Sequence, residues 1–150
     1  MDFNGSVVIY PIRAICVPSI MKHEEITSRI IKAFYNVYNQ LGFGFLEKVY
    51  ENSLVIELRK IGLHCASQVP VNVHYDYQPV GDYFADIIVE DLVILELKAA
   101  EGICEEHEAQ LVNYLKATDK EVGLLLNFGK TAQFKRKIFD NELKGDRIRI

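Results

Sequence analysis

The spacing of apolar residues changes at Leu63, and this change constrains the fold more than any other feature of the chain. Before it, apolar residues recur every three or four positions, which is the period of an amphipathic helix. After it, Val69, Val71, Val73 and Tyr75 alternate with polar residues, which is the period of a strand with one buried face. The sequence therefore predicts helices followed by a sheet, and its 150 residues are enough for one domain with one core.

Two helices are expected first. The first begins at Glu24 and ends before Gly42, because glycine is the commonest residue just after a helix. The second covers about residues 46–61 and ends before Gly62. The apolar stripe of the first helix consists of Ile26, Ile30, Ile31, Phe34, Val37, Tyr38 and Leu41.

The remaining elements alternate between strand and helix signals. A turn at 77–81 precedes a strand at 83–89, and a tight reversal leads to a nearly continuous apolar strand at 92–97, which is expected in the centre of the sheet. The expected order is ααβββαβ, followed by a C-terminal element of undecided type, which makes one α/β domain. The later elements are a helix over Glu105–Ala117 with Ala109, Val112 or Leu111, and Leu115 inward, a buried strand over 122–126, and a segment over 134–139 that fits a strand or a short helix.

Residues 1–23 form an extension before the domain at 24–150. Pro11 and Arg13 interrupt its apolar run, so a secretory signal is not expected, and only residues 7–10 fit a short strand. No run of 18 apolar residues exists, so no membrane contact is expected. The three cysteines are an odd number without a CxxC pair, which disfavours a disulfide scaffold and a four-cysteine metal site and favours the cytoplasm.

Charge is unevenly distributed along the chain. The formal net charge is −4, yet residues 130–150 carry seven Lys and Arg against three Asp and Glu. The acidic body argues against strong, unaided binding to nucleic acid. The basic C-terminal segment either contacts phosphates or is a solvated face.

Ionisable residues interrupt two strands that otherwise have a core composition. Glu96 and Lys98 lie in the apolar run at 93–98, two residues apart and therefore on one face of a strand. Asp86 lies in the apolar run at 84–89. A buried charge costs several kcal/mol unless it is paired or bound to a metal, so these three residues are candidates for chemistry.

The expected hairpin brings two of these residues close together. If the chain reverses at Glu90 and Asp91, residues whose numbers sum to about 181 face each other, and Asp86 lies opposite residue 95. A bulge or a slip of one residue would align Asp86 with Glu96.

Two converging carboxylates form a site suited to Mg²⁺ or Mn²⁺, which prefer oxygen ligands. Lys98 beside them can orient a water or stabilise charge that develops on a phosphate. The alternative is a buried ion pair of Lys98 with Glu96 or Asp86 that does no chemistry.

These residues resemble the D…(D/E)xK core of the PD-(D/E)xK nuclease-like superfamily, with Ala85 where the name has proline. The likeness is closest to the GxxExxY family and covers about residues 24–139. It implies a restriction-endonuclease-like α+β core, in which helices flank a central mixed sheet. The motifs are Gly44-Phe45-Leu46-Glu47-Lys48-Val49-Tyr50, Gln68-Val69-Pro70, Glu96-Leu97-Lys98-Ala99, the helix motif at 107–115 and the glycine-bounded motif at 123–129.

The resemblance implies metal-dependent hydrolysis of phosphodiester bonds in nucleic acid, with DNA favoured over RNA. Asp86 and Glu96 would hold Mg²⁺ or Mn²⁺, and Glu47 would complete the ligand set directly or through water. Lys98 would position the attacking water or help to deprotonate it.

The resemblance also implies roles for helix residues, each with a structural alternative. Gln110 and Tyr114 match the QxxxY motif of RecB-type nucleases and could contact a phosphate or order the site. They could equally be a surface residue and a core residue. Glu47 could serve only as a first-turn carboxylate favoured by the helix dipole. Tyr50 fits either a hydrogen bond to Glu47 or a place in the core.

Three functions follow from these patterns. The first is a metal-dependent nuclease, with the site residues Glu47, Asp86, Glu96, Lys98, Gln110 and Tyr114. The second is a catalytically silent module on the same fold that binds nucleic acid or takes part in an assembly. The third is a structural dimerisation domain, so a homodimer or a partner protein is also considered.

Overall fold

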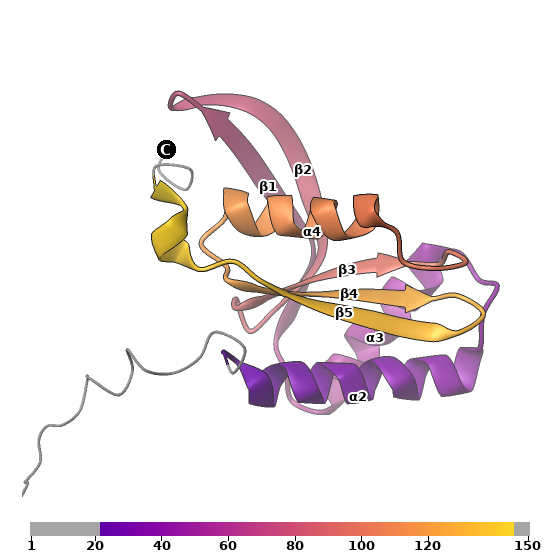
Figure 1. The fold of residues 1–150 in the computed structure, drawn as a ribbon. Coiled ribbons are helices and arrows are strands. Elements are labelled where there is room, and N and C mark those ends of the chain that lie inside the picture. The colour runs from indigo at the N-terminus through magenta and orange to yellow at the C-terminus, as the bar shows by residue number, and fades with distance from the viewer. Residues whose placement is uncertain (1–21, 146–150) are drawn as a thin grey trace, which may run out of the picture.

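The computed structural model describes residues 22–145, and in this part of the chain the expected order of helices and strands is confirmed (Figure 1). The segment at 134–139, which fitted a strand or a helix, is a strand. The helices are α2 (Glu24–Leu41), α3 (Glu47–Lys60) and α4 (Glu105–Ala117), followed by a short 3₁₀ helix, η3 (Asn141–Leu143). The strands are β1 (Cys65–Tyr75), β2 (Gln78–Val89), β3 (Val93–Lys98), β4 (Val122–Phe128) and β5 (Ala132–Ile138).

The five strands form one mixed sheet in the order β1-β2-β3-β4-β5. β3 and β4 are parallel and are joined by α4, whereas every other neighbouring pair is antiparallel. Helices α2 and α3 cover one face of the sheet and α4 covers the other (Figure 1). The fold is therefore α+β, with the flanked mixed sheet that the sequence predicts.

Side chains of the central strands alternate between two cores. Val93, Leu95 and Leu97 pack with α2 and α3, whereas Ile94 and Leu125 pack with α4. These side chains are at most 1% exposed, and each contributes about 1.5–3 kcal/mol through burial. Because both faces are covered, β3 is apolar almost throughout, and any ionisable side chain on it must be accommodated locally.

β1 and β2 extend beyond the rest of the sheet as a two-stranded arm (Figure 1). β2 pairs with β3 only at residues 87–89, so residues 78–85 pair with β1 alone. The turn at the tip is formed by Asp76 and Tyr77, whose φ angles of 53° and 62° match the two-residue turns that suit hairpins. The prediction of a turn at 77–81 is therefore wrong, because residues 78–81 belong to β2. Pro79 lies inside β2, where the arm leaves one edge of the strand without a partner and no N–H is required.

The bounds of α4 are as predicted, and its buried face is predicted in part, because Leu115 and the alternative Leu111 are buried as expected but Ala109 is not. Leu111, Tyr114 and Leu115 are buried, whereas Ala109 is exposed and Val112 is only partly covered. The reason lies in β4: a Cβ added to Gly123 would meet Leu111 Cδ1 at 2.6 Å, so the glycine makes room for this leucine. The helix is thereby rotated so that Leu111, and not Ala109, meets the sheet.

Two predictions fall outside the described residues, namely the short strand at 7–10 and the basic side chains of Arg147 and Arg149. No helix within residues 22–145 is long and apolar enough to cross a membrane.

Candidate active site

Asp86 and Glu96 face each other where the pairing between β2 and β3 ends. The last regular pair is Ile87 with Leu95, so the next pair in this register is Asp86 with Glu96. At this point the backbone N–H groups donate to side-chain carboxylates and no longer to carbonyls of the neighbouring strand. The Asp86 N–H donates to Glu96 Oε2 at 3.0 Å, and the Leu97 N–H donates to Asp86 Oδ2 at 2.8 Å.

The one-residue slip that aligns the carboxylates comes from the hairpin loop. Val89 pairs with Val93, so the loop contains three residues and paired numbers sum to 182. Glu90 and Asp91 both have positive φ, and the Leu92 N–H donates to Val89 O at 2.9 Å. The loop therefore fixes the register on which the site depends.

The strand opposite Asp86 is also irregular. Ser67 pairs with Ile87 and Val69 with Ala85, but Gln68 between them has a φ of 53°. Residues other than glycine rarely adopt this left-handed backbone conformation, which costs about 1–3 kcal/mol. It persists where the surrounding structure enforces it, and such places are commonly functional sites. The strained residue therefore lies across from Asp86.

The strained backbone directs the Gln68 amide toward two carboxylates. Gln68 Nε2 donates to Glu51 Oε1 at 2.9 Å and approaches Asp86 Oδ1 at 3.5 Å. Glu51 is only 5% exposed, and its other oxygen accepts a hydrogen bond from Lys48 Nζ at 3.0 Å. Sequence reasoning missed Glu51, and it quoted Gln68 only as part of a motif, without a role. The available signal was the spacing of Glu51, which lies four residues after Glu47 and hence on the same helix face.

Glu47 lies near the two strand carboxylates but does not contact them. It is exposed in the first turn of α3 and makes no hydrogen bond or ion pair with another described residue. Its negative charge nevertheless contributes to raising the pKa values of Asp86 and Glu96. Of the three predicted ligands, the structure brings two together and leaves the third within electrostatic range.

The site carries more negative charge than its surroundings balance. Burial, and after it the negative charge of Asp86, raises the pKa of the Glu96 carboxyl to about 8, whereas Lys98 acts in the opposite direction. Burial also raises the pKa of Asp86, and the charges of Glu51 and Glu47 add to this effect. Without a bound cation, ionising Glu96 is therefore unfavourable.

Lys98 is held by a chain of hydrogen bonds that leads to α4. Its Nζ donates to Gln110 Oε1 at 3.2 Å, and Gln110 Nε2 donates to the Tyr114 hydroxyl at 3.1 Å. Tyr114 is a core residue, 5% exposed, yet its hydroxyl takes part in this chain. Among residues 22–145 no ion pair joins Lys98 to Glu96 or Asp86, so the alternative of a structural ion pair is not what the structure shows.

The loop after Lys98 is fixed by Asn127 on the neighbouring strand. Asn127 pairs in register with Lys98 and is completely buried. Its Oδ1 accepts from the Ala100 N–H at 2.9 Å and its Nδ2 donates to Ala100 O at 3.0 Å. A Cβ on Gly129 would meet Ala100 O at 2.1 Å, so this position requires glycine.

Tyr50 is a structural residue, which decides between its two alternatives. Its hydroxyl donates to Gly42 O at 2.6 Å and accepts from the Phe45 N–H at 3.2 Å. Its ring stacks on Phe128 with centroids 4.3 Å apart. It therefore fixes the loop before α3, and no hydrogen bond links it to Glu47 among the described residues.

The donor set fits a hard divalent cation, although the described residues contain no group of three or more His, Cys, Asp or Glu side chains arranged around one point. Asp86 and Glu96 place carboxylate oxygens at the same end of the β2–β3 pairing, and Mg²⁺ and Mn²⁺ prefer oxygen ligands. Glu96 Oε1 accepts no hydrogen bond from any residue in the described range. The like charges that raise both pKa values are the ones that a cation would neutralise.

Comparison with known proteins agrees with this geometry. A family model described as the PD-(D/E)XK nuclease superfamily matches residues 24–138, which include both helices before the sheet and all five strands. Neither the search of curated proteins nor the search of solved structures finds a match. The chain belongs to the PD-(D/E)XK nuclease superfamily.

Proposed function

We propose that this chain is a metal-dependent nuclease that hydrolyses phosphodiester bonds of nucleic acid, DNA in preference to RNA. One observation carries the proposal: Asp86 and Glu96 are aligned at the end of a backbone ladder, two residues from a lysine that Gln110 holds in place. A purely structural role would not require a buried carboxylate beside a partly buried one, both with raised pKa values.

In this proposal Asp86 and Glu96 hold Mg²⁺ or Mn²⁺, and Glu47 reaches the ion directly or through water. A cation bound there would polarise the scissile phosphate and lower the pKa of a bound water. The charge repulsion that raises the pKa of Glu96 would then be relieved, because both carboxylates would face a positive charge.

The remaining residues position the reacting groups. The Lys98 ammonium orients the attacking water and stabilises the negative charge that develops as the water oxygen bonds to phosphorus and the ester P–O bond breaks. Gln110 and Tyr114 fix the direction of Lys98 through their hydrogen bonds. Gln68 and Glu51 fix the orientation of Asp86 from the opposite side.

We further infer that the chain belongs to the GxxExxY family within the superfamily. The motif at 44–50 has a structural meaning that supports this assignment. Gly44 has a φ of 110°, which glycine adopts readily, Glu47 begins α3, and Tyr50 ties the preceding loop.

The test is cleavage of single-stranded and duplex DNA and RNA with Mg²⁺ or Mn²⁺, together with calorimetric titration of Mn²⁺. We expect Lys98→Met and Glu96→Ala each to lower the rate at least about 100-fold, as the loss of a transition-state contact does. Glu105→Gln is the matched control, because Glu105 is an exposed carboxylate at the start of α4. Its rate is expected to equal that of the wild type.

A catalytically silent module is the second candidate, favoured by the lack of a three-ligand group among residues 22–145. The same experiment separates the two functions. A wild-type protein that binds no Mn²⁺ and leaves every polynucleotide intact would support the module and refute the nuclease.

A further inference from the structure

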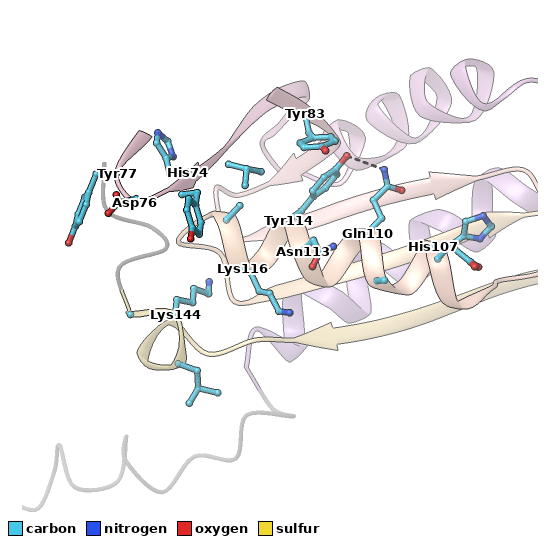
Figure 2. Close-up of a pocket in the computed structure, with 17 residues that line it drawn as sticks. His74, Asp76, Tyr77, Tyr83, His107, Gln110, Asn113, Tyr114, Lys116 and Lys144 are labelled. Carbon is cyan, nitrogen blue, oxygen red and sulfur yellow. Dashed lines mark hydrogen bonds between the residues drawn. The ribbon is translucent and has the colours of Figure 1, made fainter. Parts of the chain in front are cut away.

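A cavity of about 1230 Å³ lies between the β1–β2 arm, α4 and the turn at η3 (Figure 2). The arm supplies His74, Tyr77 and Tyr83 to its wall, and α4 supplies Asn113 and Lys116 from the other side. The volume exceeds the roughly 300–1,000 Å³ of small-molecule sites, which suggests a larger or extended ligand.

Four tyrosine rings line this cavity, which we name the tyrosine groove. Tyr75, Tyr77 and Tyr83 are 76%, 57% and 49% exposed, so the arm presents large aromatic surfaces to solvent. The Tyr83 ring leads inward to Tyr114, with centroids 5.9 Å apart. Contiguous exposed aromatic surface of this kind marks a binding site more often than chance.

The tyrosine groove borders the candidate active site through two residues that belong to both. Gln110 and Tyr114 line the groove and are hydrogen-bonded to each other (Figure 2). Gln110 also accepts the hydrogen bond from Lys98, so the two residues form the chain that holds the lysine. A ligand that occupies the groove therefore contacts the same side chains that position the lysine.

We propose that the tyrosine groove binds a single-stranded segment of nucleic acid and leads it to the active site, with bases stacked on the tyrosine rings. This inference rests on the proposed function and specifies its substrate as a single strand. Stacking needs open base faces, which a duplex covers with neighbouring base pairs but a single strand exposes.

The charges around the groove support a single strand over a duplex. Recognition of a duplex through its backbone depends on several lysine or arginine contacts to phosphates. Among the described residues that line the groove, Lys116 and Lys144 are balanced by Asp76 and Glu106. Lys144 is also 1% exposed and donates to three oxygens of the protein, so its charge is already engaged. Affinity must then come mainly from the aromatic rings.

The test measures binding of a fluorescent oligothymidine of about 15 nucleotides by anisotropy in EDTA, within the ~4–16 nucleotides that single-strand sites occupy. We expect it to bind more tightly than a blunt duplex of equal length. Tyr75→Ala and Tyr77→Ala should each weaken binding about 5- to 100-fold, the loss expected for one stacking contact.

Phe84→Ala is the matched control. Phe84 lies on the same arm next to Tyr83 and is 54% exposed, but it does not line the groove. Its variant should bind the oligothymidine as the wild type does. All of these side chains are exposed, so the variants are expected to fold.

Three results would overturn the proposal: equal binding of duplex and single strand, unchanged binding by the tyrosine variants, or a wild-type dimer that Tyr75→Ala dissociates while no oligonucleotide binds. The last result would make the groove a contact between two copies. Hydrolysis of bis-p-nitrophenyl phosphate with Mn²⁺ tests the nuclease separately, because this small diester does not need the groove. If the oligothymidine binds but the diester is not hydrolysed, the groove proposal stands and the nuclease proposal is refuted. If the diester is hydrolysed but the single strand is not bound selectively, the nuclease proposal stands and the groove proposal is refuted.

Discussion

Two buried polar side chains on neighbouring parallel strands differ in how well the surrounding protein satisfies their hydrogen bonds and charge. Asn127 on β4 has both amide atoms hydrogen-bonded to Ala100. Glu96 on β3 is 3% exposed and, within residues 22–145, accepts one hydrogen bond, from the Asp86 N–H, while burial raises its pKa to about 8. Asn127 therefore stabilises the fold, whereas Glu96 costs stability in its ionised form. A side chain that the fold leaves unbalanced is a better guide to function than one that the fold satisfies.

The largest effect that separates the two regions is expected at Asn127. Asn127→Leu removes the partner of the Ala100 N–H and C=O groups, which lie partly buried beside it, and should lower the free energy of unfolding by about 2–5 kcal/mol. Urea denaturation measures this loss. Asn52→Leu is the control, because Asn52 is exposed on α3, and its effect should stay within about 0.5 kcal/mol. Equal losses in the two variants would show that the loop after β3 does not depend on Asn127.

The second effect is expected at Glu96 and depends on pH. The ordinary pKa of 4.5 applies to the unfolded chain, and the pKa in the folded chain is about 8. Between these values the folded state keeps a proton that the unfolded state has released, so the free energy of unfolding falls as pH rises. Without divalent cation the fall attributable to Glu96 should be about 2–4 kcal/mol between pH 5 and pH 9.

Glu96→Gln removes this titration while it keeps the shape and the acceptor oxygen of the side chain. Its free energy of unfolding should therefore exceed that of the wild type at pH 9 and approach it at pH 5. Urea denaturation in EDTA at the two pH values measures the difference. Parallel pH profiles for the two proteins would mean that Glu96 is not held in a protonated form, and the contrast with Asn127 would fail.

The sequence predicted the regular helices and strands around these two side chains better than the irregular backbone. Apolar periodicity located the helices and the central strands, because it reports which faces are buried. The alignment of Asp86 with Glu96 was foreseen as a one-residue slip, and the three-residue hairpin loop produces that slip. The metal-ligand role of Glu47 stays a prediction.

The irregular parts depend on backbone conformations that the sequence does not signal. The tip of the arm uses positive φ at Asp76 and Tyr77, where glycine or asparagine would have indicated the turn, and Pro79 drew the expected turn into the strand. Gln68 also has positive φ without being glycine. The brace between Asn127 and Ala100 joins residues that lie 27 positions apart, so only the folded sheet shows it.

The smallest effect is expected at Gln68, whose amide is hydrogen-bonded to Glu51 and lies beside the carboxylate of Asp86. Gln68→Gly relieves the left-handed backbone and should raise the free energy of unfolding by about 1 kcal/mol, since glycine adopts positive φ without steric cost. The same change removes the amide that orients Asp86 and Glu51, so the proposed nuclease activity should fall about 10-fold.

Gln68→Ala separates the two consequences, because it removes the amide but keeps the strained backbone. Its activity should fall as far as that of Gln68→Gly, without the gain in stability. Urea denaturation and cleavage rates of both variants, with kcat and KM determined separately, measure the outcome. If Gln68→Gly gained stability at full activity, the strain at this position would serve no purpose in positioning Asp86. If both variants lost activity and only the glycine gained stability, the fold would be sacrificing stability at Gln68 to keep two carboxylates in place, as it does at Glu96.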